Sequence, residues 1–312
     1  GPGAHDAPPT ALPATYHRDF TMTTHYLNPK SGAHPFTRTD APRPHIFLLS
    51  VDMIPRESYD PCSPLREHLR TPHMDRLFAD GIRFSHACST SPLCGPSRAA
   101  YLTGRYSYMT VNEERAHDGW QATLRPGDVI FPEYLKAAGY LTKHAGKGHV
   151  GTEKFLDAFG ENDAPWNRWA PPLSDDDAYL AYLADRGLEP PLWYEPLTGL
   201  RPDGVTPGNS FGGWVRQASG EPFPPEGLYD FYLAELAARK LDAALRQREP
   251  GQPLYLQLDL FGPHQPFMIP ESFRERFAEL LQVVELPATY EEALSGDAKW
   301  PRVYEFYRRN WG

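Results

Sequence analysis

The sequence HIFLLSVD at residues 45–52 predicts a buried strand followed by a carboxylate. Its apolar run, residues 46–51, is short and continuous, which is typical of a strand that is covered on both faces in a parallel sheet. The run stops at Asp52. We expect this segment to form the first strand of the core.

Strand and helix patterns alternate along much of the remaining chain. Helices are predicted between Thr71 and Gly81 and at residues 96–102, 129–138, 228–246 and 271–281, and strands at residues 82–87, 140–144 and 254–260. Thr71 and the proline after it suit a helix start, and glycine suits a helix end. Such alternation favours an α/β fold with a mostly parallel central sheet flanked by helices, and a site at the carboxyl ends of its strands.

Composition narrows the classes of protein that fit. A chain of 312 residues with 40% hydrophobic residues can form one large α/β domain or two smaller ones. The net charge of −9, without any run rich in Lys and Arg, gives no electrostatic basis for binding nucleic acid. The apolar runs are far shorter than the roughly 20 residues that span a bilayer. Three cysteines, Cys62, Cys88 and Cys94, are too few for a disulfide framework.

Two segments lack a clear period. Residues 1–43 begin with Gly-Pro-Gly, which is typical of a protease-cleavage scar from an expression tag, and continue as an extended arm. Residues 160–226 are rich in Pro, Gly, Trp and acidic residues, and we expect an irregular insertion near the site. This insertion either shapes the choice of substrate or is a solvated excursion without a role.

The sequence CGPSRAAYLTGR at residues 94–105 is the segment that carries chemistry. Pro96 suits the first turn of a helix and so places Cys94 at its N-terminus, where unpaired N–H groups and the macrodipole favour anions. Arg98, one turn further on, would point its guanidinium toward the same end. Together they would stabilise a charged nucleophile or a bound oxyanion. The alternative is a buried free cysteine beside a surface arginine.

This segment resembles the signature of the formylglycine-dependent (type I) sulfatases of the alkaline phosphatase-like superfamily, in which the cysteine is oxidised to formylglycine after translation. GKGH at residues 146–149 is similar to the family's Gly-Lys-Trp-His, and GPHQP at residues 262–266 is similar to a later segment that contains a histidine. The resemblance covers residues 44 to about 270. It implies that residues 44–312 form the N-terminal part of a sulfatase-like domain.

The resemblance also implies roles for individual residues. Cys94 would become the nucleophile, and Asp52 and residue 94 would bind one divalent cation, Ca²⁺ or alternatively Mg²⁺ or Mn²⁺. Arg98, Lys147 and His264 would supply positive charge, and the last two would contact the substrate sulfate. His149 would manage the proton of the nucleophile and His264 would stabilise the leaving oxygen, or the two histidines would exchange these roles.

The implied partners are a small-molecule or saccharide sulfate ester and a formylglycine-generating or other sulfatase-maturing enzyme. We assign no catalytic role to four other histidines, because single histidines are more often structural. These are His73, His86, His117 and His144.

Two departures from the family pattern qualify this assignment. Met53 stands where most sulfatases have a second aspartate, and methionine offers no oxygen to a hard cation. No Asp-Asn-Gly or Asp-His-Gly motif, which completes the metal site in the family, occurs before Gly312. We therefore expect a fragment, a naturally shortened homologue, or one piece of a two-chain enzyme in which a second chain carries the C-terminal half.

The leading hypothesis is metal-dependent hydrolysis of a sulfate ester. Relatives that hydrolyse phosphonate monoesters and phosphodiesters also carry a single aspartate at the position of Asp52. A hydrolase of those substrates on the same scaffold is therefore the first alternative. The second is a non-catalytic sulfatase-like protein that binds an anion without turnover.

Overall fold

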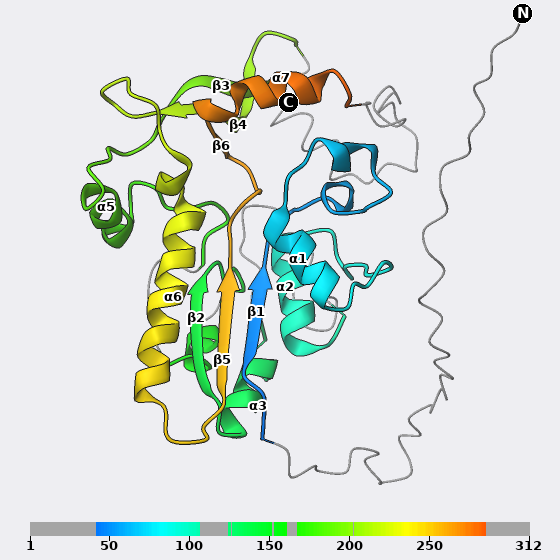
Figure 1. Ribbon diagram of the computed structural model, residues 1–312, viewed down its shortest axis with the longest axis vertical. Helices are drawn as coiled ribbons and strands as arrows, with labels where there is room; N and C mark the ends of the chain where they lie inside the picture. The colour runs from blue at the N-terminus through cyan, green and yellow to red at the C-terminus, as the bar shows by residue number, and fades with distance from the viewer. Residues whose placement is uncertain are drawn as a thin grey trace, which may run out of the picture. The chain divides into compact units, whose positions relative to one another are not determined.

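Three parallel strands form the central sheet of the computed structural model, which describes residues 42–106, 124–125, 127–151, 153–160, 167–201 and 203–284. They are β1 (Ile46–Ser50), β2 (Leu141–Gly146) and β5 (Leu254–Asp259), in the order β1-β5-β2. All three end at the same edge of the sheet (Figure 1), where Ser50 and Gly146 both pair with Asp259. These strands confirm the predictions at residues 46–51, 140–144 and 254–260, and with them the expected fold class.

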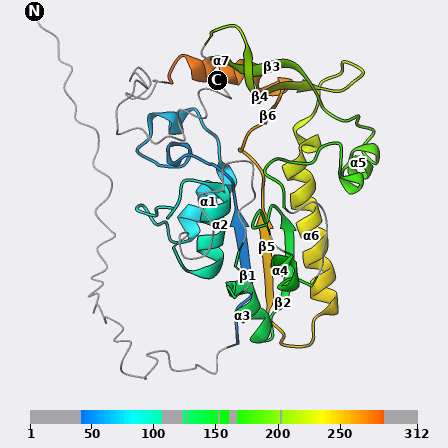
Figure 2. The ribbon, with the colours of Figure 1, turned by 180° about the vertical axis from the view of Figure 1, so that it is seen from behind.

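Helices pack on both faces of this sheet and enclose two apolar clusters. On one face, α2 (Cys94–Thr103) and α4 (Lys154–Asp157) contribute Leu102 and Phe155 to a cluster that includes Tyr255 of β5, and Ile130, the residue before α3 (Phe131–Ala137), joins it. On the other face, α5 (Asp177–Ala184) and α6 (Tyr229–Gln247) enclose Leu256 and Leu258 of β5. Figure 2 shows the sheet from behind, with α3 and α4 in view. The strand β5 is buried along its whole length because it has a neighbour on each edge and a layer on each face.

The remaining helices and 3₁₀ turns lie between β1 and α2, before α6 and after β5. The helix α1 confirms the prediction between Thr71 and Gly81, and α7 together with a preceding 3₁₀ turn confirms the prediction at residues 271–281. Their bounds are η1 (Arg56–Ser58), η2 (Pro64–Glu67), α1 (Pro72–Asp80), η5 (Pro225–Gly227), η6 (Glu271–Phe273) and α7 (Arg274–Leu281).

The helix α2 begins at Cys94, two residues before its predicted start. Pro96 lies in its first turn, where the missing N–H of proline costs no helical hydrogen bond. The helix ends at Gly104, which has a φ of 68° and donates its N–H to the Ala100 carbonyl. Proline and glycine thus fix both ends of the element that positions the cysteine.

The prediction of a strand at residues 82–87 is wrong. This segment has no regular structure, and Ile82 and Phe84 are exposed, with 84% and 78% of their surface accessible. A high strand propensity describes side chains that fit a half-buried pleated surface. Here the described residues offer no neighbouring strand for the segment to pair with.

The segment at residues 160–226 contains more regular structure than its composition indicated. Its described residues include α5 and two long strands, β3 (Leu192–Leu200) and β4 (Pro207–Arg216), which pair antiparallel. With β6 (Phe267–Pro270) they form a second sheet of order β3-β4-β6. The register of β3 against β4 shifts three times, so the apolar residues do not alternate regularly and the strand pattern is hidden in the sequence.

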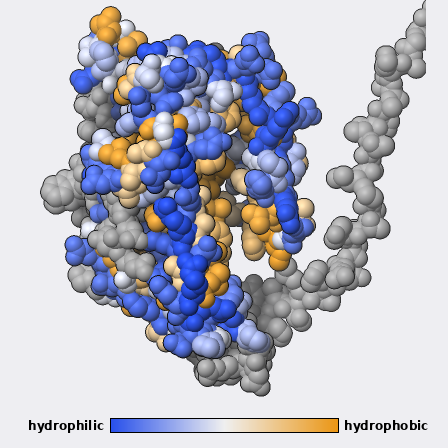
Figure 3. Space-filling model, turned by 60° about the vertical axis from the view of Figure 1, so that its left-hand side comes forward, coloured by the Kyte–Doolittle hydropathy of each residue, from blue (hydrophilic) through white to orange (hydrophobic). Residues whose placement is uncertain are grey.

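The strand β1 has one uncovered face. Phe47 and Leu49 pair with Leu256 and Leu258 and so point to the α6 side of the sheet, yet they remain 59% and 44% exposed. Figure 3 shows apolar residues at the surface of one face of the molecule, with hydrophilic residues on both sides of them. Among the described residues, no helix is long and apolar enough to cross a membrane.

Candidate functional site

The site lies where the loops that follow β1, β2 and β5 meet. The backbone N–H of Asp52 donates to the Gly262 carbonyl at 3.1 Å, and that of Lys147 donates to the Asp259 carbonyl at 2.9 Å. Gly146 makes this approach possible, because its φ is 103° and a Cβ there would lie 1.9 Å from the Asp259 carbonyl oxygen. The three strand ends are therefore fastened to one another by backbone hydrogen bonds.

A buried cluster of opposite charges occupies this junction. The Nζ of Lys147, whose side chain is fully buried, lies 2.5 Å from Asp52 Oδ2, and Arg98 Nη2 lies 3.6 Å from the same oxygen. Arg98 Nη1 donates to the Lys147 carbonyl at 2.5 Å. Buried charges are stable only when they are paired and hydrogen-bonded, and the two cations satisfy this condition through shared partners.

Cys94 lies beside these two cations. Its side chain is half-buried. The charge interaction with Cys94 acts to raise the pKa of both Lys147 and Arg98. The pKa of Lys147 is nevertheless lowered, because burial outweighs the carboxylate of Asp52 and Cys94. Cys62, Cys88 and Cys94 are all free thiols.

Two histidines complete the set predicted from the sequence. Burial, then the charges of Lys147 and Arg98, lower the pKa of His149 to about 3. Burial, then the charge of Lys147, lower that of His264 as well. His264 Nδ1 donates to the Gln265 carbonyl at 2.5 Å, which leaves the lone pair of the neutral ring on Nε2. The Nδ1 of His149 is buried and has no hydrogen-bond partner among the described residues.

The loop that carries His264 is held by α6. Asp230, in the first turn of α6, accepts hydrogen bonds from the backbone N–H groups of Phe261 and Gly262, both at 2.9 Å. The structure thus brings all six predicted residues to one place, from three strand ends and one helix N-terminus. They are Asp52, Cys94, Arg98, Lys147, His149 and His264.

Comparison with known proteins assigns the chain to a family. A sequence model of the family described as "Sulfatase" matches residues 58–289, which are most of the chain and contain every predicted site residue except Asp52. This chain belongs to the sulfatase family. Members of the family generally use a metal ion and formylglycine.

Individual relatives match parts of this sulfatase chain. Steryl-sulfatase of Rattus norvegicus is 42% identical over 89 residues, which are 27% of this chain and 15% of that protein. Uncharacterized sulfatase YidJ of Escherichia coli K12 is 27% identical over 213 residues, 68% of this chain and 37% of that protein. The chain therefore spans less than half the length of either curated relative.

A solved structure resembles the fold only in general terms. The crystal structure of a phosphonate monoester hydrolase of Agrobacterium radiobacter has a TM-score of 0.46 and 20% identity, and the match covers 75% of this chain and 44% of that one. At this level of likeness, no conclusion about the site or the substrate follows from it.

The described residues do not by themselves fit a complete divalent metal site. Asp52 supplies one carboxylate, but its Oδ2 is already engaged by Lys147 and Arg98. Within the described ranges, no group of three His, Cys, Asp or Glu side chains is placed to hold a metal ion. Met53 adds no oxygen ligand, because its side chain carries only a thioether.

Sequence reasoning missed the carboxylate beneath the site. Asp259 is fully buried at the end of β5 and accepts hydrogen bonds from Arg98 at 3.2 Å, Tyr101 at 3.2 Å and Gln257 at 2.7 Å, and it contacts His144 Nε2 at 3.0 Å. Burial acts to raise its pKa, yet the hydrogen bond with His144 and the charge of Arg98 leave the pKa lowered. A carboxylate inside the apolar run at residues 254–260 was the available signal, because it demands partners.

His144, to which we assigned no catalytic role, contacts Asp259, which in turn accepts a hydrogen bond from Arg98. His144 therefore supports the site indirectly. His73 and His86 do not take part in this network, and His117 lies outside the described residues.

Trp169 is a second residue that the sequence analysis did not single out. Its backbone carbonyl accepts a hydrogen bond from Lys147 Nζ at 2.7 Å, and its ring centroid lies 5.8 Å from that of His264. It belongs to the segment at residues 160–226, so one part of the expected insertion does reach the site.

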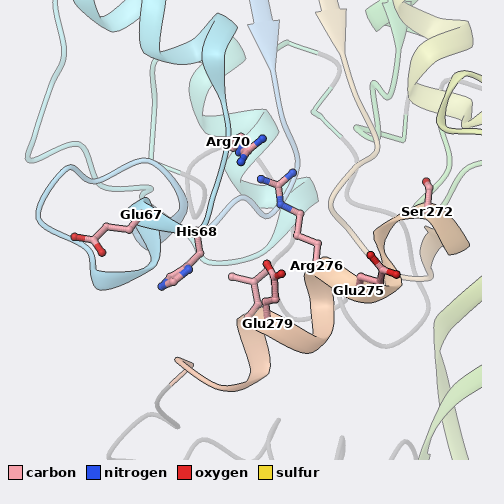
Figure 4. A pocket seen from close by; sticks show the side chains of 8 residues that line it. Glu67, His68, Arg70, Ser272, Glu275, Arg276 and Glu279 are labelled. Carbon is pink, nitrogen blue, oxygen red and sulfur yellow. The ribbon is translucent and has the colours of Figure 1, made fainter.

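A pocket of about 290 Å³ lies outside this cluster, between η2 and the η6–α7 segment. Figure 4 shows the guanidinium groups of Arg70 and Arg276 lying close together there, with Glu279 below them. None of the six predicted site residues lines this pocket, which is formed by Glu67, His68, Arg70, Ser272, Glu275, Arg276, Glu279 and Leu280.

Proposed function

We propose that this chain carries the nucleophile and anion-binding groups of a sulfuric ester hydrolase, with Cys94 acting after oxidation to formylglycine. The observation that carries the proposal is the position of Cys94 at the first residue of α2, beside the buried cations Arg98 and Lys147. A negatively charged group at this place gains from both cations and from the free N–H groups of the helix. Membership of the sulfatase family supports the same reaction class.

In this proposal Arg98 and Lys147 bind the sulfate group of the substrate. Both side chains are almost fully buried, so their interaction with an anion is weakly screened by water. Lys147 has a lowered pKa because of burial, and an additional negative charge would favour its protonated form. A bound sulfate would therefore favour the positively charged form of Lys147, which in turn binds the sulfate.

The nucleophile in this proposal is one hydroxyl of the hydrated formylglycine. Its oxygen attacks sulfur, the bond between sulfur and the alcohol oxygen breaks, and the alcohol oxygen takes up a proton. The second hydroxyl then loses its proton, the aldehyde re-forms and sulfate leaves. His264 carries its free lone pair on Nε2 and His149 is neutral, so each is suited to accept a proton from the diol before one is passed to the leaving oxygen.

The proposal includes a divalent cation, Ca²⁺, Mg²⁺ or Mn²⁺, which would need more ligands than the described residues provide. Asp52 would supply one oxygen and residue 94 a second, and additional oxygen ligands would have to join them. We propose a small-molecule or saccharide sulfate ester as the substrate class. The proposed partner is a formylglycine-generating or other maturing enzyme.

The test combines mass and turnover on one sample. The chain is produced together with a formylglycine-generating enzyme, the peptide that contains Cys94 is fragmented, and hydrolysis of an aryl sulfate is measured in the presence of Ca²⁺. We expect an aldehyde or its hydrate at residue 94 and turnover that Cys94→Ala abolishes. An aldehyde at residue 94 without anion binding or turnover would overturn the proposal.

Met53 favours one alternative, the hydrolysis of phosphonate monoesters or phosphodiesters. Its side chain is 58% exposed and offers no oxygen for a second metal contact, as in the single-aspartate pattern. Comparing turnover of an aryl sulfate with that of a phenyl phosphonate ester decides between the two. Binding of both without turnover of either, in a sample carrying the aldehyde, would instead indicate a non-catalytic anion-binding protein.

A further inference from the structure

Trp169 is fixed to the site through its backbone. Lys147 Nζ donates one hydrogen bond to the Trp169 carbonyl at 2.7 Å and contacts Asp52 at 2.5 Å, so the same buried ammonium group positions both. This tether uses only the main chain of residue 169. The position of the backbone is therefore independent of which side chain residue 169 carries.

The indole ring of Trp169 has no comparable cover. It is 52% exposed although its backbone is anchored to a fully buried lysine. Among the described residues, the ring of His264 lies beside it, at 5.8 Å between centroids and an interplanar angle of 58°. A large, partly exposed aromatic surface beside polar site residues is a common feature of ligand-binding sites.

The position of the ring relative to the reaction suggests what it binds. In the proposed function, Lys147 binds the sulfate, and of the two histidines that could serve the leaving oxygen we take His264, whose Nε2 carries the free lone pair. The group next to His264 and outside the buried charges is then the alcohol part of the ester. Trp169 lies beside both residues, because its carbonyl accepts a hydrogen bond from Lys147 and its ring lies 5.8 Å from that of His264. Its indole is therefore within reach of an alcohol bound next to His264.

We propose that Trp169 is a specificity-determining residue that packs against the ring of a ring-bearing alcohol in the substrate. This inference rests on the proposed function. A flat ring with an apolar face covers the indole and gains a packing contact of the kind seen between aromatic side chains, whereas a short open-chain alcohol leaves the indole in water. Aromatic rings present a flat face and saturated rings present a face of C–H groups, and either can pack against an indole, so the proposal names the ring and not its chemistry.

The test uses sulfonates, which keep the anionic head of a sulfate ester but have a carbon–sulfur bond in place of the scissile bond. Dissociation constants of benzenesulfonate, cyclohexanesulfonate and methanesulfonate are measured by calorimetry on the full chain. We expect the ring-bearing ligands to bind more tightly than methanesulfonate. Trp169→Ala should weaken their binding by about tenfold, the equivalent of one aromatic contact, and leave methanesulfonate within about twofold.

Two further variants separate packing from indirect effects. Trp169→Phe keeps an aromatic face and should restore most of the lost affinity. Trp193→Ala is the matched control, because this indole is also partly exposed at 39% but lies on β3, where its Nε1 donates to the Phe267 carbonyl. It should leave all three constants unchanged. The ratio between benzenesulfonate and cyclohexanesulfonate then tells an aromatic from a saturated, sugar-like preference.

The outcomes separate this inference from the function on which it rests. If methanesulfonate and the ring-bearing sulfonates all bind but Trp169→Ala changes none of them, or weakens all equally, the role of Trp169 is overturned and the anion site stands. If no sulfonate binds the unsubstituted chain, the proposed anion site itself fails, and the inference falls with it.

Discussion

Asp259 shows at the scale of a single residue how the site is supported. Its carboxylate has no exposure to water and is stabilised by contacts from Arg98, Tyr101, Gln257 and His144. A carboxylate with this many donors keeps its charge despite burial. The charge in turn holds Arg98, which reaches Asp52 and lies beside Cys94.

Asp259→Asn tests this support. The amide keeps the size of the side chain but removes the charge, so Arg98 stays buried with one of its two carboxylates lost. We expect the free energy of unfolding to fall by about 3 kcal/mol, the typical cost of breaking a buried pair, measured by urea unfolding. Asp242→Asn, at an exposed position of α6, is the control and should stay within about 0.5 kcal/mol. Equal effects of the two variants would contradict the assignment.

His149 gives stability a specific dependence on pH. Its pKa is about 3 in the folded chain, below the ordinary value of 6.5, because burial and two cations oppose its charge. Between these values the unfolded chain binds the proton and the folded chain does not, so stability falls as the pH falls from about 6.5 toward 3. This loss amounts to about 1.4 kcal/mol for each pH unit in that window.

His149→Asn removes this contribution and keeps a residue that tolerates the positive φ of 50°. Urea unfolding between pH 8 and pH 4 should therefore show a shallower loss of stability for the variant than for the unsubstituted chain. Parallel curves for the two proteins would mean that His149 does not stay neutral in the folded state.

At the scale of elements, the site depends on how closely β2 and β5 approach at their carboxyl ends. Gly146 ends β2 in a left-handed conformation and faces the carbonyl of Asp259. This contact places Lys147 over the end of the central strand. The apolar strand pattern sets the position of β2 in the sheet, whereas Gly146 sets the direction of the backbone after the strand ends.

Gly146→Ala is expected to destabilise the fold by about 3 kcal/mol or more, because a Cβ would lie 1.9 Å from a carbonyl oxygen that is itself part of a strand. Gly104→Ala is the matched control. It also has a positive φ, 68°, but no atom lies within 4 Å of its Cβ position, so only the conformational cost of about 1 kcal/mol remains. The thermal unfolding midpoint should therefore fall much further for Gly146→Ala than for Gly104→Ala, and equal shifts would contradict the steric role of Gly146.

At the scale of the whole molecule, the charged cluster joins segments that are distant along the chain. Arg98 and Asp259 are separated by 161 positions, and Lys147 and Asp52 by 95.

The central sheet is small, and Phe47 and Leu49 remain open to solvent on its edge strand β1. Strands of parallel sheets are normally covered on both faces, so this apolar face is unusual for its position.

This exposed face predicts binding of a hydrophobic dye. The chain should enhance the fluorescence of Nile red, an uncharged dye without the sulfonate group that the proposed anion site binds, and the double variant Phe47→Ser, Leu49→Thr should reduce this enhancement by about half, since it removes both exposed side chains from one face. Circular dichroism checks that the fold is kept. Unchanged dye binding in a folded double variant would place the dye elsewhere.

The sequence alone determined the core strands and most of the helices, and it predicted the six candidate site residues. These are local features: a continuous apolar run marks a buried strand, proline and glycine mark the ends of α2, and the residues from Cys94 to Arg105 carry their spacing within one segment. Only the tertiary structure decided that residues 82–87 form no strand, that Asp259 and His144 lie beneath Arg98, and that Trp169 meets Lys147 and His264. The physical reason is that strand pairing, the compensation of a buried charge and the exposure of an aromatic ring all depend on neighbours far away along the chain, which no local pattern records.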